Sequence, residues 1–241
     1  MGIESFHDGD LEEAEEYFIK AIEYGQRSHT TFSNLAQVEE KLGKYGKALE
    51  HYNYVLSEDA YFKDALIGRG RCLIELKKYD IAQISLRKYL KIEENSTEGL
   101  YLAANCYFKE RDYYTALNYL EKANKIDPNY TDALYLRGVL EGRLGFQNKA
   151  EHLFFKVLEL NPQMYQSYYG LATLHFMSGE FNDALEYYSI AENNGVESEE
   201  LISQKGLCYL NLKRSDKACE EFKKIKDNRK RNELLSQFCN M

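Results

Sequence analysis

The chain is poor in proline, lacks tryptophan and has no long hydrophobic run. Only 2 of its 241 residues are proline and none is tryptophan. Proline removes a hydrogen bond from a helix interior and clashes with the preceding turn, so its scarcity favours a chain made mostly of helix. No stretch approaches the ~18 apolar residues that a membrane-spanning helix needs. We therefore expect no membrane span.

Basic charge is also in deficit. The chain carries 31 Lys and Arg against 39 Asp and Glu, which gives a formal net charge of −8. Nucleic acids attract basic surfaces, so this balance argues against a nucleic-acid partner. Residues 1–6 have neither the basic region nor the apolar core of a signal peptide. We therefore expect a soluble, acidic protein of the cytoplasm.

Familiar catalytic and metal-binding motifs are missing as well. The sequence contains no Gly-rich phosphate loop followed by Lys-Ser/Thr, no His-Glu-x-x-His and no Gly-x-Ser-x-Gly. Its histidines form no pair at i, i+4, whereas a transition-metal site needs clustered ligands. We interpret His175 as a hydrogen-bonded structural residue. These observations predict a non-enzymatic protein with no metal site and no cofactor.

What the chain does have is an internal repeat with a constant period. Alanine recurs every 34 residues, at Ala14, Ala48, Ala82, Ala116, Ala150, Ala184 and Ala218. A small residue lies twelve positions before each alanine, at Gly2, Ala36, Gly70, Ala104, Gly138, Ala172 and Gly206. A large apolar residue lies four positions after each, at Phe18, Tyr52, Leu86, Leu120, Phe154, Tyr188 and Phe222. Three such columns without an insertion indicate a repeat architecture.

The columns predict two antiparallel helices in each period. A small residue and an alanine twelve positions later suit a place where two helix backbones approach closely. The large residue four positions after the alanine shares its helical face and fills the next layer. Between the helices a glycine can end the first one in the left-handed conformation, as at Gly43 and Gly145. Pro128 and Pro162 stop the second helix.

The pattern resembles the tetratricopeptide repeat, which has the same period of about 34 residues. One copy of the pattern is matched by Phe32, Leu35, Ala36, Tyr45, Ala48 and Tyr52. A second copy is matched by Leu134, Gly138, Ala150, Phe154 and Pro162. A third copy is matched by Tyr168, Leu171, Ala172, Phe181, Ala184, Tyr188 and Ala191. The resemblance implies an all-α fold, a right-handed superhelical α-solenoid of about seven helix-turn-helix units.

The resemblance covers the chain as a single solenoid, residues 1–241. Its expected parts are a partial repeat 1–28, repeats 29–62, 63–96, 97–130, 131–164, 165–198 and 199–232, and a C-terminal cap 233–241 that extends the last helix. The first copy begins at its seventh position, so we expect the chain to be a piece of a longer repeat protein. The alternative is a natural protein whose short first helix suffices.

The cysteines follow the repeat. Cys72, Cys106 and Cys208 share one position, and equivalent positions of stacked repeats should lie roughly 8–10 Å apart. That distance exceeds the ~7 Å limit between the Cα atoms of a disulfide. With Cys219 and Cys239 the total is odd, which fits a reducing compartment. We predict that all five are free thiols, mostly in the core.

One stripe of each first helix is a candidate partner-binding surface. An α-helix turns by 100° per residue, so positions 2, 5, 9, 12 and 13 of each unit lie on one side of its first helix. The resemblance implies that this stripe lines a concave groove. The stripe contains Ile67, Arg71, Ile74, Tyr101, Asn105, Phe108, Lys109, Tyr135, Val139, Arg143, Tyr169, Thr173 and Phe176, followed by Met177. Tyrosine combines apolar area with a hydroxyl and is common at binding hot spots. The alternative is that these rings pack laterally on their neighbours.

We therefore predict a protein-protein interaction scaffold or adaptor. A peptide or protein partner would bury apolar side chains against the Tyr/Phe groove, with Arg71, Lys109 and Arg143 setting its polarity. Repeats of this family that hold acidic chaperone tails use a cationic clamp on the same stripe. The clamp places a cation at the second position of the repeat, and that position is occupied here by Asp64, Glu98 and Asp132. That ligand is therefore not expected.

Two other functions stay open from the sequence. The chain could be a regulatory or targeting domain of a larger, even enzymatic, protein. It could also self-assemble as a weak homo-oligomer, because residues 4–16 are strongly acidic and residues 213–231 strongly basic.

Overall fold

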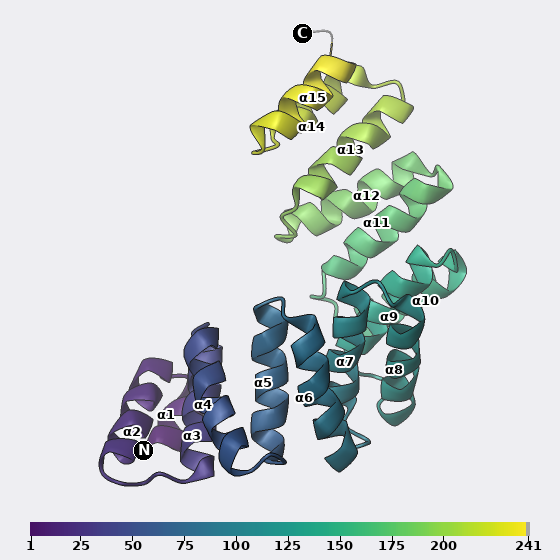
Figure 1. The fold of residues 1–241 in the computed structure, drawn as a ribbon. Coiled ribbons are helices and arrows are strands. Elements are labelled where there is room, and N and C mark those ends of the chain that lie inside the picture. The colour runs from purple at the N-terminus through teal and green to yellow at the C-terminus, as the bar shows by residue number, and fades with distance from the viewer. Residues whose placement is uncertain (240–241) are drawn as a thin grey trace. The chain divides into compact units, whose positions relative to one another are not determined.

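The computed structural model describes residues 1–239 as fifteen α-helices without a strand (Figure 1). The helices follow one another as α1 (Gly2–Asp8), α2 (Leu11–Glu23), α3 (His29–Lys41), α4 (Tyr45–Glu58), α5 (Lys63–Glu75), α6 (Tyr79–Ile92), α7 (Thr97–Lys109), α8 (Tyr113–Ile126), α9 (Thr131–Arg143), α10 (Gln147–Leu160), α11 (Gln166–Ser178), α12 (Phe181–Asn193), α13 (Glu199–Asn211), α14 (Ser215–Lys223) and α15 (Asn228–Phe238). The predicted all-α fold is confirmed. None of the described helices is both long and apolar enough to cross a membrane.

The chain divides into two compact units at the boundary between residues 130 and 131. Unit 1 contains α1 to α8, and unit 2 contains α9 to α15. Within each unit, α1–α2, α3–α4 and the later pairs form hairpins that pack on the next hairpin in sequence. The boundary coincides with the predicted end of repeat 97–130. The stacking of all copies into one superhelix stays a prediction.

The repeat columns form the core of each hairpin. All seven alanines of the alanine column are fully buried. A Cβ atom added to Gly70 would lie 2.7 Å from Cδ2 of Leu86, and one added to Gly138 would lie 2.8 Å from Cε1 of Phe154. The large residue sixteen positions later thus occupies the space that the missing Cβ leaves. The helices approach closely for this reason.

A left-handed residue follows the first helix of every hairpin. Seven positions spaced by the repeat period have positive φ, namely Gly9, Gly43, Lys77, Arg111, Gly145, Gly179 and Lys213. The sequence predicted this conformation only where glycine marks it. The three basic residues adopt it too, with φ between 58° and 66°. The turn geometry is therefore the same in all copies, whatever the residue.

The C-terminal cap differs from the prediction that it extends the last helix. α14 ends at Lys223, and α15 is a separate helix that begins at Asn228. The carboxylate of Asp227 accepts hydrogen bonds from the backbone N–H groups of Arg229 and Lys230, at 2.8 and 3.3 Å. This N-cap starts a new helix at that point. Residues 240 and 241 of the predicted cap lie outside the described residues.

The prediction of five free thiols is wrong for two of them. Cys219 of α14 and Cys239, which follows α15, form a disulfide with Cα atoms 5.8 Å apart. These two cysteines share no repeat column, so the period carried no information about their distance. Cys72, Cys106 and Cys208 are free and buried, as predicted.

Candidate functional site

The first helices of the hairpins line one face of each unit. In unit 1, α3 contacts α5 and α5 contacts α7 directly, and in unit 2, α9 contacts α11 and α11 contacts α13. Among the described residues, no second helix contacts the next second helix to the same extent. The side on which neighbouring hairpins approach most closely is the inside of a curve. The first helices therefore form the inner side of each unit.

The predicted groove residues fall into two groups on this side. Ile67 and Ile74 are only 7% and 8% exposed and belong to a core cluster with Leu86 and Leu102. The others keep solvent-accessible surface, and we call them the first-helix face. This face comprises Arg71, Tyr101, Asn105, Phe108 and Lys109 in unit 1, and Tyr135, Val139, Arg143, Tyr169, Thr173 and Phe176 in unit 2. Its use by a partner stays a prediction.

Arg71 is the centre of an ion cluster that joins three first helices. Its Nε and Nη2 atoms donate to both carboxylate oxygens of Glu40 on α3, at 2.5 and 3.1 Å. Its Nη1 atom donates to Glu98 on α7 at 2.9 Å. Burial opposes the charge of Arg71, but the hydrogen bonds and charges of both carboxylates outweigh it and raise the pKa of the guanidinium. Arg71 therefore serves to hold the helices together, and its charge is already compensated.

The aromatic rings of unit 1 pack laterally without being enclosed. Tyr101 meets Tyr130 edge to face with ring centroids 5.7 Å apart, and Phe108 lies 5.9 Å from Tyr113. The ammonium of Lys109 lies over the Phe108 ring, 5.8 Å from its centroid. Such contacts fix the rings, and both rings keep part of their surface accessible to solvent.

In unit 2 the rings pack on large residues of the second helices. Tyr135 lies 5.9 Å from Phe154, and Tyr169 lies 5.8 Å from the fully buried Tyr188. Burial is the main cause that raises the pKa of both Tyr135 and Tyr169 above the ordinary value. Their hydroxyls therefore stay protonated at neutral pH and can donate hydrogen bonds. The lateral packing that the sequence left as an alternative is present, together with residual exposure.

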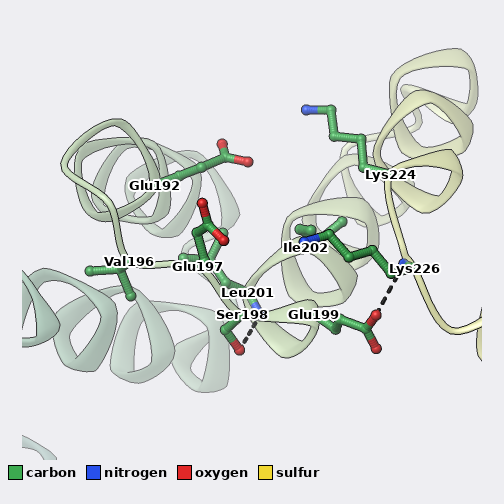
Figure 2. Close-up of a pocket in the computed structure, with 9 residues that line it drawn as sticks. All are labelled: Glu192, Val196, Glu197, Ser198, Glu199, Leu201, Ile202, Lys224 and Lys226. Atoms are coloured by element: carbon green, nitrogen blue, oxygen red, sulfur yellow. Dashed lines mark hydrogen bonds between the residues drawn. The ribbon is translucent and has the colours of Figure 1, made fainter.

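Unit 2 also contains a cavity of about 320 Å³ that sequence reasoning missed (Figure 2). It lies between the end of α12, the start of α13 and the connection to α15, and its walls include Glu192, Ile202 and Lys224. The carboxylate of Glu199 accepts the backbone N–H groups of Lys226 and Asp227, at 3.0 and 2.9 Å. Carboxylates and ammonium groups both line the cavity. No repeat column could reveal it, because the α14–α15 connection departs from the period.

His175 takes part in a polar contact rather than standing alone. Its Nδ1 lies 2.5 Å from a carboxylate oxygen of Glu180, and its ring stacks on Tyr187 at 5.2 Å. Ligand atoms of His175, Glu180 and Asp183 lie within 4.8 Å of one another, a set that could hold a metal ion. The hydrogen bond and the ring contact account for the position of the imidazole.

Family models described as "Tetratricopeptide repeat" match residues 6–61 and 135–195, residues 40–106 and residues 200–230. The model of "Anaphase-promoting complex, cyclosome, subunit 3" matches residues 79–140.

Two curated relatives match parts of the chain. An Hsp70-Hsp90 organising protein of Plasmodium falciparum is 30% identical over 96 residues, 40% of this chain and 38% of that protein. The BBSome complex member BBS4 of Bos taurus is 28% identical over 184 residues, 75% of this chain and 35% of that protein. The chain thus spans little more than a third of the length of either relative.

Solved structures share the fold. A tetratricopeptide repeat protein of Parabacteroides merdae superposes with a TM-score of 0.76 at 22% identity, covering 98% of this chain and 94% of the other. The Cut9-Hcn1 structure superposes with a TM-score of 0.86 at 13% identity, covering 99% of this chain and 48% of the other. YrrB, described as a repeat protein with an unusual peptide-binding site, superposes with a TM-score of 0.60 at 22% identity. The match covers 82% of this chain and 97% of the other.

Proposed function

This chain belongs to the tetratricopeptide repeat family, and we propose that it is a scaffold that binds a peptide or protein partner on the first-helix face. The proteins that it resembles include an Hsp70-Hsp90 organising protein and YrrB, a repeat protein with an unusual peptide-binding site. Binding would bury apolar side chains of the partner against the accessible surface of Tyr101 and Phe108 in unit 1, or of Tyr135 and Tyr169 in unit 2.

The observation that carries the proposal is the combination of fixed and accessible aromatic rings. Each ring is held by a neighbour, as Tyr169 is by Tyr188, so little side-chain entropy is lost when a partner covers it. Packing between hairpins leaves these rings partly exposed, although it buries Ile67 and Ile74 of the same stripe. Preformed aromatic surface is what an apolar anchor needs.

The charges of the face favour an apolar partner over an acidic tail. Glu98 occupies a position where a clamp for acidic tails would place a cation, and the neighbouring guanidinium of Arg71 is already paired with Glu40 and Glu98. An incoming carboxylate would therefore meet a carboxylate and a compensated cation. Lys109 and Arg143, which are both exposed, would orient polar groups at the rim of the partner.

The test compares captured partners between matched tyrosine variants. Tyr101→Ala, Tyr135→Ala and Tyr169→Ala are combined, and the control is Tyr54→Ala with Tyr114→Ala, because these two rings are 43% and 77% exposed on second helices. Quantitative mass spectrometry of proteins captured from the native source should show partners that the control keeps and the triple variant loses. Circular dichroism checks that each variant folds.

A second variant covers the case in which the triple variant does not fold. Lys109→Glu with Arg143→Glu reverses two exposed charges of the face. It removes the contact of Lys109 with Phe108 but keeps the ring-to-ring contacts of Tyr101, Tyr135 and Tyr169. It should weaken the same interactions. Retention of every partner by this variant and by a folded triple variant would refute the first-helix face as the binding surface.

A further inference from the structure

A second cavity, of about 280 Å³, lies in unit 1 and shares no lining residue with the first-helix face. Its walls come from α4 and the following turn, from α5 and from α6. The lining residues are Asn53, Leu56, Ser57, Ala60, Leu66, Arg69, Ile84 and Lys88. Two of them are cations and none is acidic. This is unusual in a chain whose formal net charge is −8.

Among the described residues, the partners that hold Arg69 in place are neutral. Its Nε donates to Oδ1 of Asn53 at 2.7 Å, and its Nη1 donates to Oγ of Ser85 at 2.6 Å. A guanidinium has five N–H donors, so three of them remain for a ligand. Burial lowers the pKa of Arg69, and no carboxylate contributes to offset it. The side chain is therefore oriented, partly buried and uncompensated.

Lys88 adds a second cation to the same cavity. It is exposed on α6, and within the described residues neither Lys88 nor Arg69 forms an ion pair with a carboxylate. Two nearby cations that share no counter-charge repel each other, and an anion between them would relieve that repulsion. A phosphate monoester carries close to two negative charges at neutral pH, so it would balance both cations, whereas one carboxylate would balance one.

We propose that this cavity binds the phosphate group of a phosphorylated side chain in a protein partner. Arg69 offers the planar fork that suits a phosphate, and Lys88 supplies a mobile ammonium. The apolar walls, Leu56, Leu66 and Ile84, would contact the carbon atoms that carry the phosphate. The site is separate from the first-helix face, so it would add a phosphorylation-dependent contact to a scaffold.

The test uses N-acetyl-O-phosphoserine amide as the probe and the Nε–H signal of Arg69 in ¹H–¹⁵N spectra as the readout. The probe should shift this signal saturably, whereas sodium chloride at equal ionic strength should not. In Lys88→Gln the affinity should fall by about fivefold or more. The matched control is Lys91→Gln, because Lys91 is an exposed lysine of the same helix outside the cavity, and it should leave the affinity unchanged.

Three results would overturn the proposal. Equal affinities of Lys88→Gln and Lys91→Gln would show that the probe does not use the cavity. Equal shifts with chloride would show an effect of ionic strength. Binding of N-acetylglutamate amide as tight as that of the phosphoserine probe would show that the cavity selects a carboxylate and not a phosphate. Lys88→Gln removes no hydrogen bond or ion pair of the described residues, so the comparison does not depend on a damaged fold.

Discussion

The absence of a Cβ atom at a glycine decides how closely the two helices of a hairpin pack. Gly70, Gly138 and Gly206 each face a large side chain of the second helix, and Phe222 lies against Gly206 even closer than Leu86 lies against Gly70. Other copies have alanine in this column, at Ala36, Ala104 and Ala172. The column therefore accepts either residue, and a copy needs glycine where the side chain opposite would overlap an added Cβ.

Gly206→Ala should destabilise the protein by about 1–3 kcal/mol, because the new Cβ would overlap the fully buried ring of Phe222. Gly46→Ala is the control, since Gly46 lies in α4 with nothing within 4 Å of an added Cβ. That change should stabilise by about 0.4–1 kcal/mol. Urea unfolding measures both. Changes of the same sign in the two variants would contradict this account of the column.

The buried thiols make stability depend on alkaline pH. Burial is the main cause that raises the pKa of Cys72, Cys106 and Cys208 to about 12, whereas a thiol in the unfolded chain ionises near a pKa of about 8.5. Their contribution is complete below the unfolded value and is lost as pH rises from about 8.5 towards 12.

The unfolding free energy should therefore fall between pH 8 and pH 10.5, with up to about 2–3 kcal/mol of the fall due to each thiol. Cys106→Ala should reduce the fall by that share, whatever its effect at pH 8. Tyrosines also ionise in this range, so the difference between the two proteins is the quantity to compare. An identical fall in the variant would show that Cys106 ionises in the folded chain.

At the level of helices and turns, the repeat imposes one backbone conformation on different residues. The left-handed position after each first helix is glycine in four copies and Lys77, Arg111 or Lys213 in three. For a residue with a Cβ, this backbone conformation costs roughly 1–2 kcal/mol of free energy.

Lys77→Gly should therefore stabilise the protein by about 0.5–1 kcal/mol, because relief of the strained φ exceeds the entropy that glycine gains in the unfolded chain. Gly43→Ala at the equivalent position should destabilise by a similar amount. Thermal unfolding of the two variants measures the pair. Destabilisation by Lys77→Gly would mean that its side chain contributes more than its backbone costs.

A disulfide links the end of the last helix to α14. Leu235 of α15 shares a core cluster with Phe222 and Ile225, and the ring of Phe238 lies 6.1 Å from that of Phe222. The disulfide between Cys219 and Cys239 closes this arrangement. With a sequence separation of 20 residues, the link is worth about 3 kcal/mol in the chain-entropy account.

Reduction, or Cys219→Ser, should increase amide hydrogen exchange throughout α15. Exchange in α5 and α6 should stay unchanged, because they lie in unit 1 and contain no bonded cysteine. Equal exchange in α15 before and after reduction would show that the apolar contacts alone hold the helix. The thiol state of the protein from its native source also tests the proposed cytoplasmic location, where such a bond would be reduced.

The sequence was informative wherever a contact recurs once in every repeat. The alanine and small-residue columns predicted the hairpins because they mark close backbone contact. The left-handed turns at Lys77 and Arg111 were missed since no glycine marks them, and α15 was missed because Asp227 caps it outside the period.

Contacts between particular side chains in neighbouring copies were not predictable in the same way. Arg71 pairs with Glu40 and Glu98 at separations of 31 and 27 residues, which correspond to no column. Helical phase placed Ile67 and Ile74 on the open stripe, but it could not tell how far the adjacent first helices would cover them. The burial of a stripe depends on how closely adjacent first helices pack, and the repeat period does not determine that distance.

For the molecule as a whole, the two units carry different parts of the proposed surface. Tyr101 belongs to unit 1, and Tyr135 and Tyr169 belong to unit 2. Charges at the two ends are partly used internally, since Glu15 pairs with Lys44 and Lys230 pairs with Glu200. End-to-end assembly stays a prediction that mass measurements across a range of salt concentrations would test.

Radical footprinting of tyrosine side chains tests the central claim most directly. The protein is oxidised alone and with a partner that the control variant retains. Modification is measured at Tyr101, Tyr135 and Tyr169 and compared with that at Tyr54 and Tyr114, which lie on second helices. The partner should protect Tyr101 or Tyr169 several-fold and leave Tyr54 and Tyr114 unchanged. Protection of Tyr54 or Tyr114 with no change at Tyr101, Tyr135 and Tyr169 would contradict binding on the first-helix face.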